Sequence, residues 1–222
     1  MNKPILLLFV LLLLTTVACN RNPHQTMIGD TIPVVTDQES SLQRGDLLFV
    51  GGDSQMDNAI MGSTGYFTHV AIVDRQGDDI YLIESTPQHG VTYRPIADFY
   101  QDAMLSDSTR ATIYGMRLSH PFDVDKAIAI AKSHIGEAYD SLYLPGNDRV
   151  YCSELITEAY LDMDGKPIFS LHSMNFRDVN GDMPQFWIDW YQQLHAPIPE
   201  GVLGSNPNNM FKSSKLNMVC KL

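Results

Sequence analysis

The sequence predicts an α+β domain in which an antiparallel sheet packs against helices. Two β-branched and apolar runs, residues 68–73 and 80–85, flank a turn-rich segment, which is typical of a β-hairpin. A helical pattern follows at residues 123–134, and a second one begins at Cys152. Residues 38–222 are enough for one domain with a hydrophobic core and marginal for two.

The remaining elements follow from local patterns in the order of the chain. Residues 44–50 (RGDLLFV) predict an opening strand, and residues 54–61 predict a short helix between the first two strands. The helix at residues 123–134 has Asp123 as its N-cap and is ended by Gly136. The sequence contains no internal repeat.

The hairpin places a histidine and a carboxylate close together. A turn centred on Gln76 and Gly77 would pair Val73 with Ile80, and by the same count His69 with Glu84. Directly opposed residues in an antiparallel pair have Cβ atoms about 4.5–5.5 Å apart, so the carboxylate can accept a proton from the imidazole. The pairing depends on the turn, because a loop of odd length would send the two side chains to opposite faces. Taken alone, His69 fits a packed or hydrogen-bonded histidine better than a catalytic one.

Cys152 lies where a loop gives way to an amphipathic helix. The apolar stripe that it begins continues through Leu155, Ile156, Ala159 and Tyr160. The unpaired N–H groups and the partial positive charge at a helix start favour a thiolate over a thiol. With His69 as base and Glu84 as its orienting acid, Cys152 fits the pattern of an activated nucleophile. A buried, unreactive cysteine is the alternative.

These residues, in this order, resemble the circularly permuted branch of the NlpC-type, papain-like cysteine hydrolases, and also the lecithin retinol acyltransferases. The likeness rests on the opening strand, on TGYFTHVAIV with His69, on YLIES with Glu84 and on YCSELI with Cys152. The histidine and the acid precede the cysteine, as in the permuted members. The resemblance implies a permuted papain-like fold with an antiparallel sheet packed against the helix that bears the nucleophile.

The resemblance also implies an activity, namely acyl chemistry through a thioester, with no cofactor and no metal. The expected function is hydrolysis of an amide in a cell-wall peptide (a peptidoglycan fragment) or in an acyl amide. Acyl transfer, or non-catalytic binding of a lipid or glycan, are the alternatives. The segment GEAYD matches a family motif and suggests Tyr139 as a substrate or oxyanion contact, with Tyr151 beside the nucleophile as a second candidate.

The N-terminus predicts secretion and a lipid anchor. Residues 1–18 combine one Lys with an uninterrupted apolar run that is too short to span a bilayer, which is typical of a signal peptide. Ala18 before Cys19 resembles a lipoprotein cleavage site, so Cys19 is the expected lipidation site and residues 19–37 the tether. Asn20 does not match an inner-membrane retention signal, which favours the outer membrane, on its periplasmic or surface face.

The charge excludes one class of partner. The whole chain carries a formal charge of −11, which becomes −12 when the one Lys of residues 1–18 is removed. A chain this acidic does not attract nucleic-acid phosphates.

Three further features leave alternatives open. Cys220 allows a structural disulfide with Cys152 in an oxidising compartment. The polar residues 147–149 are either part of the substrate cleft or a solvated turn. The aromatic segment 164–199 either forms a wall of the site or covers the core, and cover is the preferred interpretation for its tryptophans, Trp187 and Trp190.

Overall fold

The computed structural model describes residues 38–222. The predicted signal peptide (1–18), the lipidation site Cys19 and the tether (19–37) lie outside the described residues, so these remain predictions. Among residues 38–222, no helix is both long and apolar enough to cross a bilayer.

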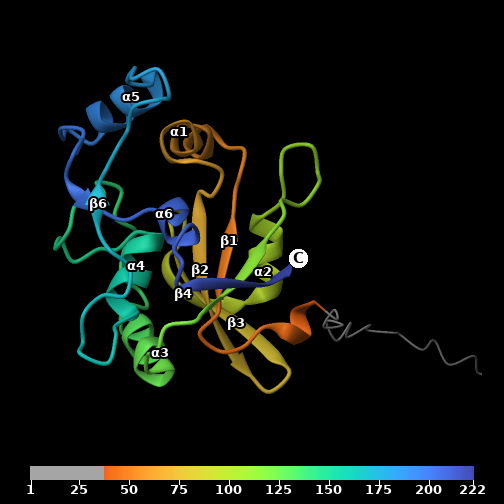
Figure 1. Cartoon of the computed structure of the whole chain (residues 1–222). Helices are drawn as coiled ribbons and strands as arrows, with labels where there is room; N and C mark the ends of the chain where they lie inside the picture. Colours follow the sequence, from red (N-terminus) through yellow and green to blue (C-terminus); the bar gives the residue numbers. More distant parts are fainter. Residues whose placement is uncertain (1–37) are drawn as a thin grey trace, which may run out of the picture. The chain divides into compact units, whose positions relative to one another are not determined.

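The structure is a mixed α+β fold built on one six-stranded sheet (Figure 1). The strand order is β4-β3-β2-β1-β5-β8, and every neighbouring pair is antiparallel. The strands are β1 (Leu47–Val50), β2 (His69–Gln76), β3 (Asp79–Thr86), β4 (Gly90–Pro95), β5 (Tyr114–Leu118) and β8 (Leu216–Lys221). A second, two-stranded sheet pairs β6 (His172–Ser173) with β7 (Leu203–Gly204).

The helices of residues 38–222 are η1 (Glu39–Ser41), α1 (Gln55–Thr64), α2 (Ile96–Asp102), α3 (Val124–Ser133), α4 (Cys152–Ala159), α5 (Gln185–Gln193) and α6 (Pro207–Phe211). Three of them, α1, α3 and α4, confirm helices that the sequence predicted. Asp123 caps α3 by accepting a hydrogen bond from the Lys126 amide at 3.0 Å, as its sequence position predicts. The short helix predicted at 54–61 is α1, which has Ser54 as its N-cap.

Two hydrophobic layers cover the opposite faces of the sheet. Helices α3 and α4 pack on one face, and α2 packs on the other (Figure 1). Because side chains alternate along β2, Val70 and Ile72 contact the first layer while Ala71 and Val73 contact the second. The residues of β2 that share the parity of Ala71 therefore face α2.

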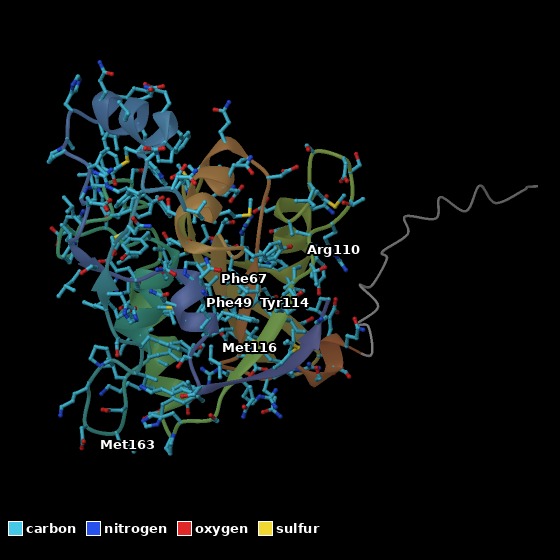
Figure 2. All side chains as sticks on the ribbon, turned by 45° about the horizontal axis from the view of Figure 1, so that its top comes forward. Phe49, Phe67, Arg110, Tyr114, Met116 and Met163 are labelled. Atoms are coloured by element: carbon cyan, nitrogen blue, oxygen red, sulfur yellow. The ribbon has the colours of Figure 1, made fainter. Side chains whose placement is uncertain are left out.

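Aromatic side chains fill the layer between the sheet and α6. Phe49, Phe67 and Tyr114 lie beside one another in Figure 2, with centroids 5.8 Å apart for Phe49 and Phe67 and 5.4 Å apart for Phe67 and Tyr114. Phe211 of α6 packs on the same cluster, 4.2 Å from the Phe67 ring. This cluster holds the chain in place just before β2, and the first residue of β2 is His69, the candidate base.

The β2–β3 hairpin forms, but its predicted register is wrong by two residues. Val73 pairs with Leu82 instead of Ile80, and Gln76 pairs with Asp79, so the turn is centred on Gly77 and Asp78. Gly77 takes a φ of 65°, which only glycine adopts without strain, and this places it at the first central position of the turn. A shift of two residues preserves the alternation of side chains, so His69 and Glu84 still share one face.

Candidate active site

The predicted helix start is confirmed: Cys152 is the first residue of α4, and the apolar stripe that it begins is buried. The carboxyl group of Glu154, two residues further on, accepts a hydrogen bond from the Tyr151 amide at 3.4 Å and so closes the start of the helix. The amides of the first turn have no acceptor within the helix and point toward its N-terminal end, where the thiol lies.

The first residue of β2 is His69, and a buried asparagine fixes the chain just before it. Asn208 of α6 accepts a hydrogen bond from the Phe67 amide at 3.0 Å and donates to the Phe67 carbonyl at 2.7 Å. It also donates to the carbonyl of Gly65, where a Cβ would lie 2.9 Å from the Asn208 side-chain oxygen. The sequence analysis did not single out Asn208, because the contact spans more than 140 residues of chain.

The structure joins His69 to Glu84. The His69 Nε2 atom lies 2.6 Å from Glu84 Oε2, and the Glu84 side chain is 1 % exposed. The second carboxylate oxygen, Oε1, accepts a hydrogen bond from Arg94 Nε of β4 at 2.8 Å. A fully buried carboxylate is therefore paired on both of its oxygens.

The thiol of Cys152 occupies the other side of the imidazole. Cys152 acts on His69 strongly enough to raise the pKa of the imidazole. Because Nε2 is engaged by Glu84, Nδ1 is the ring nitrogen left to serve the thiol. The ring of His69 also packs against Phe99 of α2, with centroids 5.8 Å apart. The His69 side chain thus lies on the α2 face of the sheet. At the N-terminal end of β2 it meets α4, a helix that covers the opposite face.

The electrostatics favour a charged pair at His69 and Glu84. Burial lowers the pKa of His69, but its hydrogen bonds with Cys152 and Glu84 outweigh burial and raise the pKa from 6.5 to about 10. Burial raises the pKa of Glu84, but the hydrogen bond and charge of His69, with the charge of Arg94, hold it below its usual value. The site thus stabilises an imidazolium beside a carboxylate at neutral pH.

A tyrosine pair lies next to Cys152. The hydroxyl oxygens of Tyr139 and Tyr143 are 3.2 Å apart, and Tyr139 bridges to Val150 in the loop before α4. Tyr143 has a φ of 54°, an uncommon conformation for a residue with a side chain. Burial and the neighbouring Tyr143 and Cys152 raise the pKa of Tyr139 well above its usual value, so its phenol remains a hydrogen-bond donor.

The remaining predicted residue, Tyr151, has a different environment. It is 4 % exposed, and its hydroxyl accepts a hydrogen bond from the Ser205 amide at 2.9 Å. It is not among the residues that line the cleft described below. Of the two tyrosines singled out by the sequence, Tyr139 is the one that reaches the cleft.

A cleft of about 520 Å³ opens onto the site. His69, Glu84 and Tyr139 are part of its lining, whereas Cys152 is 5 % exposed and is not. Apolar side chains make up much of the wall, and the described lining residues include no Lys or Arg. The apolar part is formed by Val50, Met56, Ile60, Phe99, Ala103 and Trp190, and the acidic part by Asp57, Glu84 and Asp102.

The structure divides the aromatic segment that the sequence left undecided. Trp187 is 2 % exposed and belongs to the core, as preferred, but Trp190 lines the cleft and donates to the Ser141 carbonyl at 3.2 Å. Trp190 therefore does both, covering the core and forming a wall of the site, because it packs against the cluster that contains Trp187 and also lines the cleft. The two tryptophans are three residues apart and so share one side of α5, which is why their spacing did not distinguish them in the sequence. The polar residues 147–149 do not line the cleft.

The disulfide alternative of the sequence analysis does not form in the structure. Cys152 and Cys220 are both free thiols, with Cys152 on α4 and Cys220 on β8 at the edge of the sheet. Within residues 38–222, no group of three or more His, Cys, Asp and Glu side chains is arranged to hold a metal ion.

Comparison with known proteins places this fold in a family. Residues 41–220 match the model of the permuted papain-like amidase enzymes, the YaeF/YiiX or C92 family. The uncharacterized protein YiiX of Escherichia coli (strain K12) is 22 % identical over 183 residues, which cover 81 % of this chain and 86 % of that protein. A crystal structure described as metalloprotein yiiX from Escherichia coli O157:H7 gives a TM-score of 0.67 at 19 % identity, over 82 % of this chain and 98 % of that chain.

The chain belongs to the permuted papain-like amidase family, because the family model spans most of its length. The predicted α+β, permuted papain-like fold is thereby confirmed. The family's description as amidases supports a cysteine-hydrolase kind of function. The narrower NlpC-type and acyltransferase likenesses remain predictions.

Proposed function

We propose that the protein is a cysteine amidase in which Cys152 is the nucleophile, His69 its acid–base partner and Glu84 the residue that orients His69. One observation carries the proposal: Nε2 of His69 lies 2.6 Å from the buried carboxylate of Glu84, and the Cys152 side chain is a neighbour of the same ring that raises its pKa. In the resting site His69 already holds the proton given up by the Cys152 thiol, so the thiolate attacks the amide carbonyl directly. The imidazolium then protonates the leaving amine, which leaves a neutral ring. Water resolves the thioester with His69 as base.

The tetrahedral oxyanion needs hydrogen-bond donors fixed in advance. The first amides of α4 and the phenol of Tyr139 are the candidate donors. Tyr139 supports this role because it lines the cleft, stays protonated and is held by Tyr143. Tyr151, whose hydroxyl is engaged by Ser205, is proposed to shape the loop and not to touch the substrate.

The cleft supports a substrate that is uncharged near the reacting bond. Its lining combines apolar and aromatic side chains with carboxylates, and it offers no described Lys or Arg to neutralise an anion. A carboxylate on the substrate would be repelled by Asp57 and Asp102, and burial would add a desolvation cost. We therefore favour an acyl amide, or an uncharged stretch of a cell-wall peptide, over an acidic peptide.

We further propose that the enzyme works in the cell envelope, anchored to the membrane by a lipid on Cys19. The support is the apolar segment and the Ala18-Cys19 junction, with a polar tether before the domain. A Cys19→Ser variant should move from the membrane fraction to the soluble fraction. Retention of that variant in the membrane fraction would contradict the lipid anchor.

The test of the function begins with the thiol and continues with turnover. Iodoacetamide labelling of Cys152 is followed by mass spectrometry in the wild type and in His69→Ala, and hydrolysis of a panel of N-acyl p-nitroanilides is measured in parallel. Cys152→Ser should abolish hydrolysis, whereas the matched Cys220→Ser variant should retain it. Full activity in Cys152→Ser would show that the assignment is wrong.

The same experiment separates the alternatives. Transfer of the acyl group from Cys152 to an added alcohol or amine, faster than to water, would make the protein an acyltransferase. A thiol of ordinary reactivity, with substrate bound and no acyl-enzyme formed, would leave a non-catalytic lipid- or glycan-binding module. The acyl mass on Cys152 separates both enzymes from the binding module, and the released product, free acid or acylated acceptor, separates the hydrolase from the acyltransferase.

A further inference from the structure

A fourth side chain is attached to the proposed site through Glu84. Two nitrogens of Arg94 contact Glu84 Oε1, Nε at 2.8 Å and Nη2 at 2.7 Å, while Oε2 lies 2.6 Å from His69. The two oxygens of one buried carboxylate are thus divided between the histidine and the arginine. The orientation that presents Oε2 to His69 is the one that leaves Oε1 to Arg94.

The register of β3 and β4 explains how Arg94 reaches this carboxylate. Glu84 pairs with Thr92 and Leu82 pairs with Arg94, so Arg94 is a diagonal neighbour of Glu84 on the same face of the sheet. Thr92, which lies directly opposite, has a buried hydroxyl oxygen without a hydrogen-bond partner. Arg94 is therefore the β4 side chain that fixes the carboxylate.

Arg94 is itself held from a second side. Its Nη2 also contacts the carboxylate of Asp102, at the end of α2, and the Arg94 side chain is 16 % exposed. Asp102 lines the cleft, where its side chain is about half exposed. The guanidinium thus bridges the wall of the cleft and the buried carboxylate, a geometry that suits its rigid, planar set of donors.

We infer that Arg94 is a positioning residue of the proposed amidase: it orients Glu84 toward His69 and keeps this buried carboxylate ionised. The inference rests on the proposed function, since it concerns the same site. Arg94 is not itself a lining residue of the cleft, and its contacts there are with the carboxylates of Glu84 and Asp102. Its effect on His69 therefore passes through Glu84.

The electrostatic consequence follows from the groups around the carboxylate. His69 of β2 and Arg94 of β4 face Glu84, Asp102 of α2 faces Arg94, and Cys152 of α4 faces His69. An adjacent arginine lowers the pKa of a carboxyl group by about 1–3 units. Without Arg94, the pKa of Glu84 rises, and a protonated Glu84 no longer stabilises the imidazolium that forms when His69 takes the proton of Cys152.

The test uses the full chain and the rate of iodoacetamide alkylation at Cys152 as a function of pH. In Arg94→Gln, the acidic limb of this profile should move to higher pH by about 1–3 units relative to the wild type. Arg110→Gln is the matched control, because Arg110 is exposed and stacks on the Tyr100 ring, away from Glu84. Circular dichroism of each variant confirms that it is folded.

The lysine variant makes the result decisive even if Arg94→Gln does not fold. Arg94→Lys keeps the positive charge but replaces the planar set of donors with a single ammonium group. The acidic limb of the alkylation profile should therefore stay near that of the wild type, while the plateau rate falls. A folded Arg94→Gln with an unmoved limb, or Arg94→Lys with the limb and plateau of the wild type, would overturn the inference. Failure of the proposed function looks different, because wild-type alkylation would then not depend on His69.

Discussion

Replacing Glu154 with glutamine should stabilise the protein in mild alkali. Glu154 is the third residue of α4, two positions after Cys152, and is 8 % exposed. Burial, and then the negative charge of Asp140, raise the pKa of its carboxyl group from 4.5 to about 8. The fold thus prefers Glu154 protonated at neutral pH.

The sign and size of the effect follow from proton linkage. Between pH 4.5 and about 8 the folded protein holds a proton on Glu154 that the unfolded chain has released. The stabilising contribution is therefore complete below pH 4.5 and is lost as the pH rises through about 8. A shift of this size corresponds to at most about 5 kcal/mol of unfolding free energy. Glutamine cannot ionise but keeps an oxygen that can accept the Tyr151 amide, a contact of 3.4 Å in the native protein.

The assay is urea unfolding near pH 5 and near pH 9, analysed for the free energy of unfolding. The wild type should lose stability between the two conditions, and Glu154→Gln should lose clearly less. Glu158→Gln is the control, because its carboxylate lies on the same helix with the side chain 45 % exposed. Parallel losses in the wild type and in Glu154→Gln would refute the reasoning.

Three further predictions concern the site itself. His69→Gln should slow alkylation of Cys152 about 30-fold near neutral pH, because a cysteine of ordinary pKa, about 8.5, is only about 3 % thiolate at pH 7. An unchanged rate, measured by mass spectrometry at that thiol, would remove His69 from the mechanism. Tyr139→Phe should lower kcat about 100-fold with little change in KM, as expected for an oxyanion donor. A rise in KM with kcat preserved would instead make Tyr139 a binding residue. Tyr151→Phe should cost about 1–3 kcal/mol of stability in urea, because it leaves the buried Ser205 amide unpaired. A large loss of kcat at unchanged stability would instead return Tyr151 to the substrate site.

Local chemistry was sufficient to predict several parts of this structure. Asp123 and Ser54 cap their helices, and α4 begins at Cys152, because helix starts depend on residues within a few positions of one another. The shared face of His69 and Glu84 was also predictable, although the turn was placed one position too early. That error shifted the register by two residues, and alternation made the side-chain faces insensitive to it.

Long-range packing decided the rest. Asn208 holds the chain before β2 through hydrogen bonds, and Trp190 forms part of the cleft wall. Both contacts join segments that are separated by more than 100 residues. The sequence contains these side chains but does not say which distant surface each one meets. Arg94 is closer in sequence to Glu84, yet its role depends on the register of a strand that the sequence analysis did not identify.

The sequence by itself determined the α+β class, the helix starts, and the residue types able to form a thiol, a base and an orienting acid. Only the tertiary structure decided that they meet, since α4 covers one face of the sheet while His69 and Phe99 belong to the other. Cys152 and His69 meet at the N-terminal end of β2, where the two hydrophobic layers come together. Pattern and propensity act over a few residues, whereas the closure of two layers around a sheet depends on the packing of the whole chain.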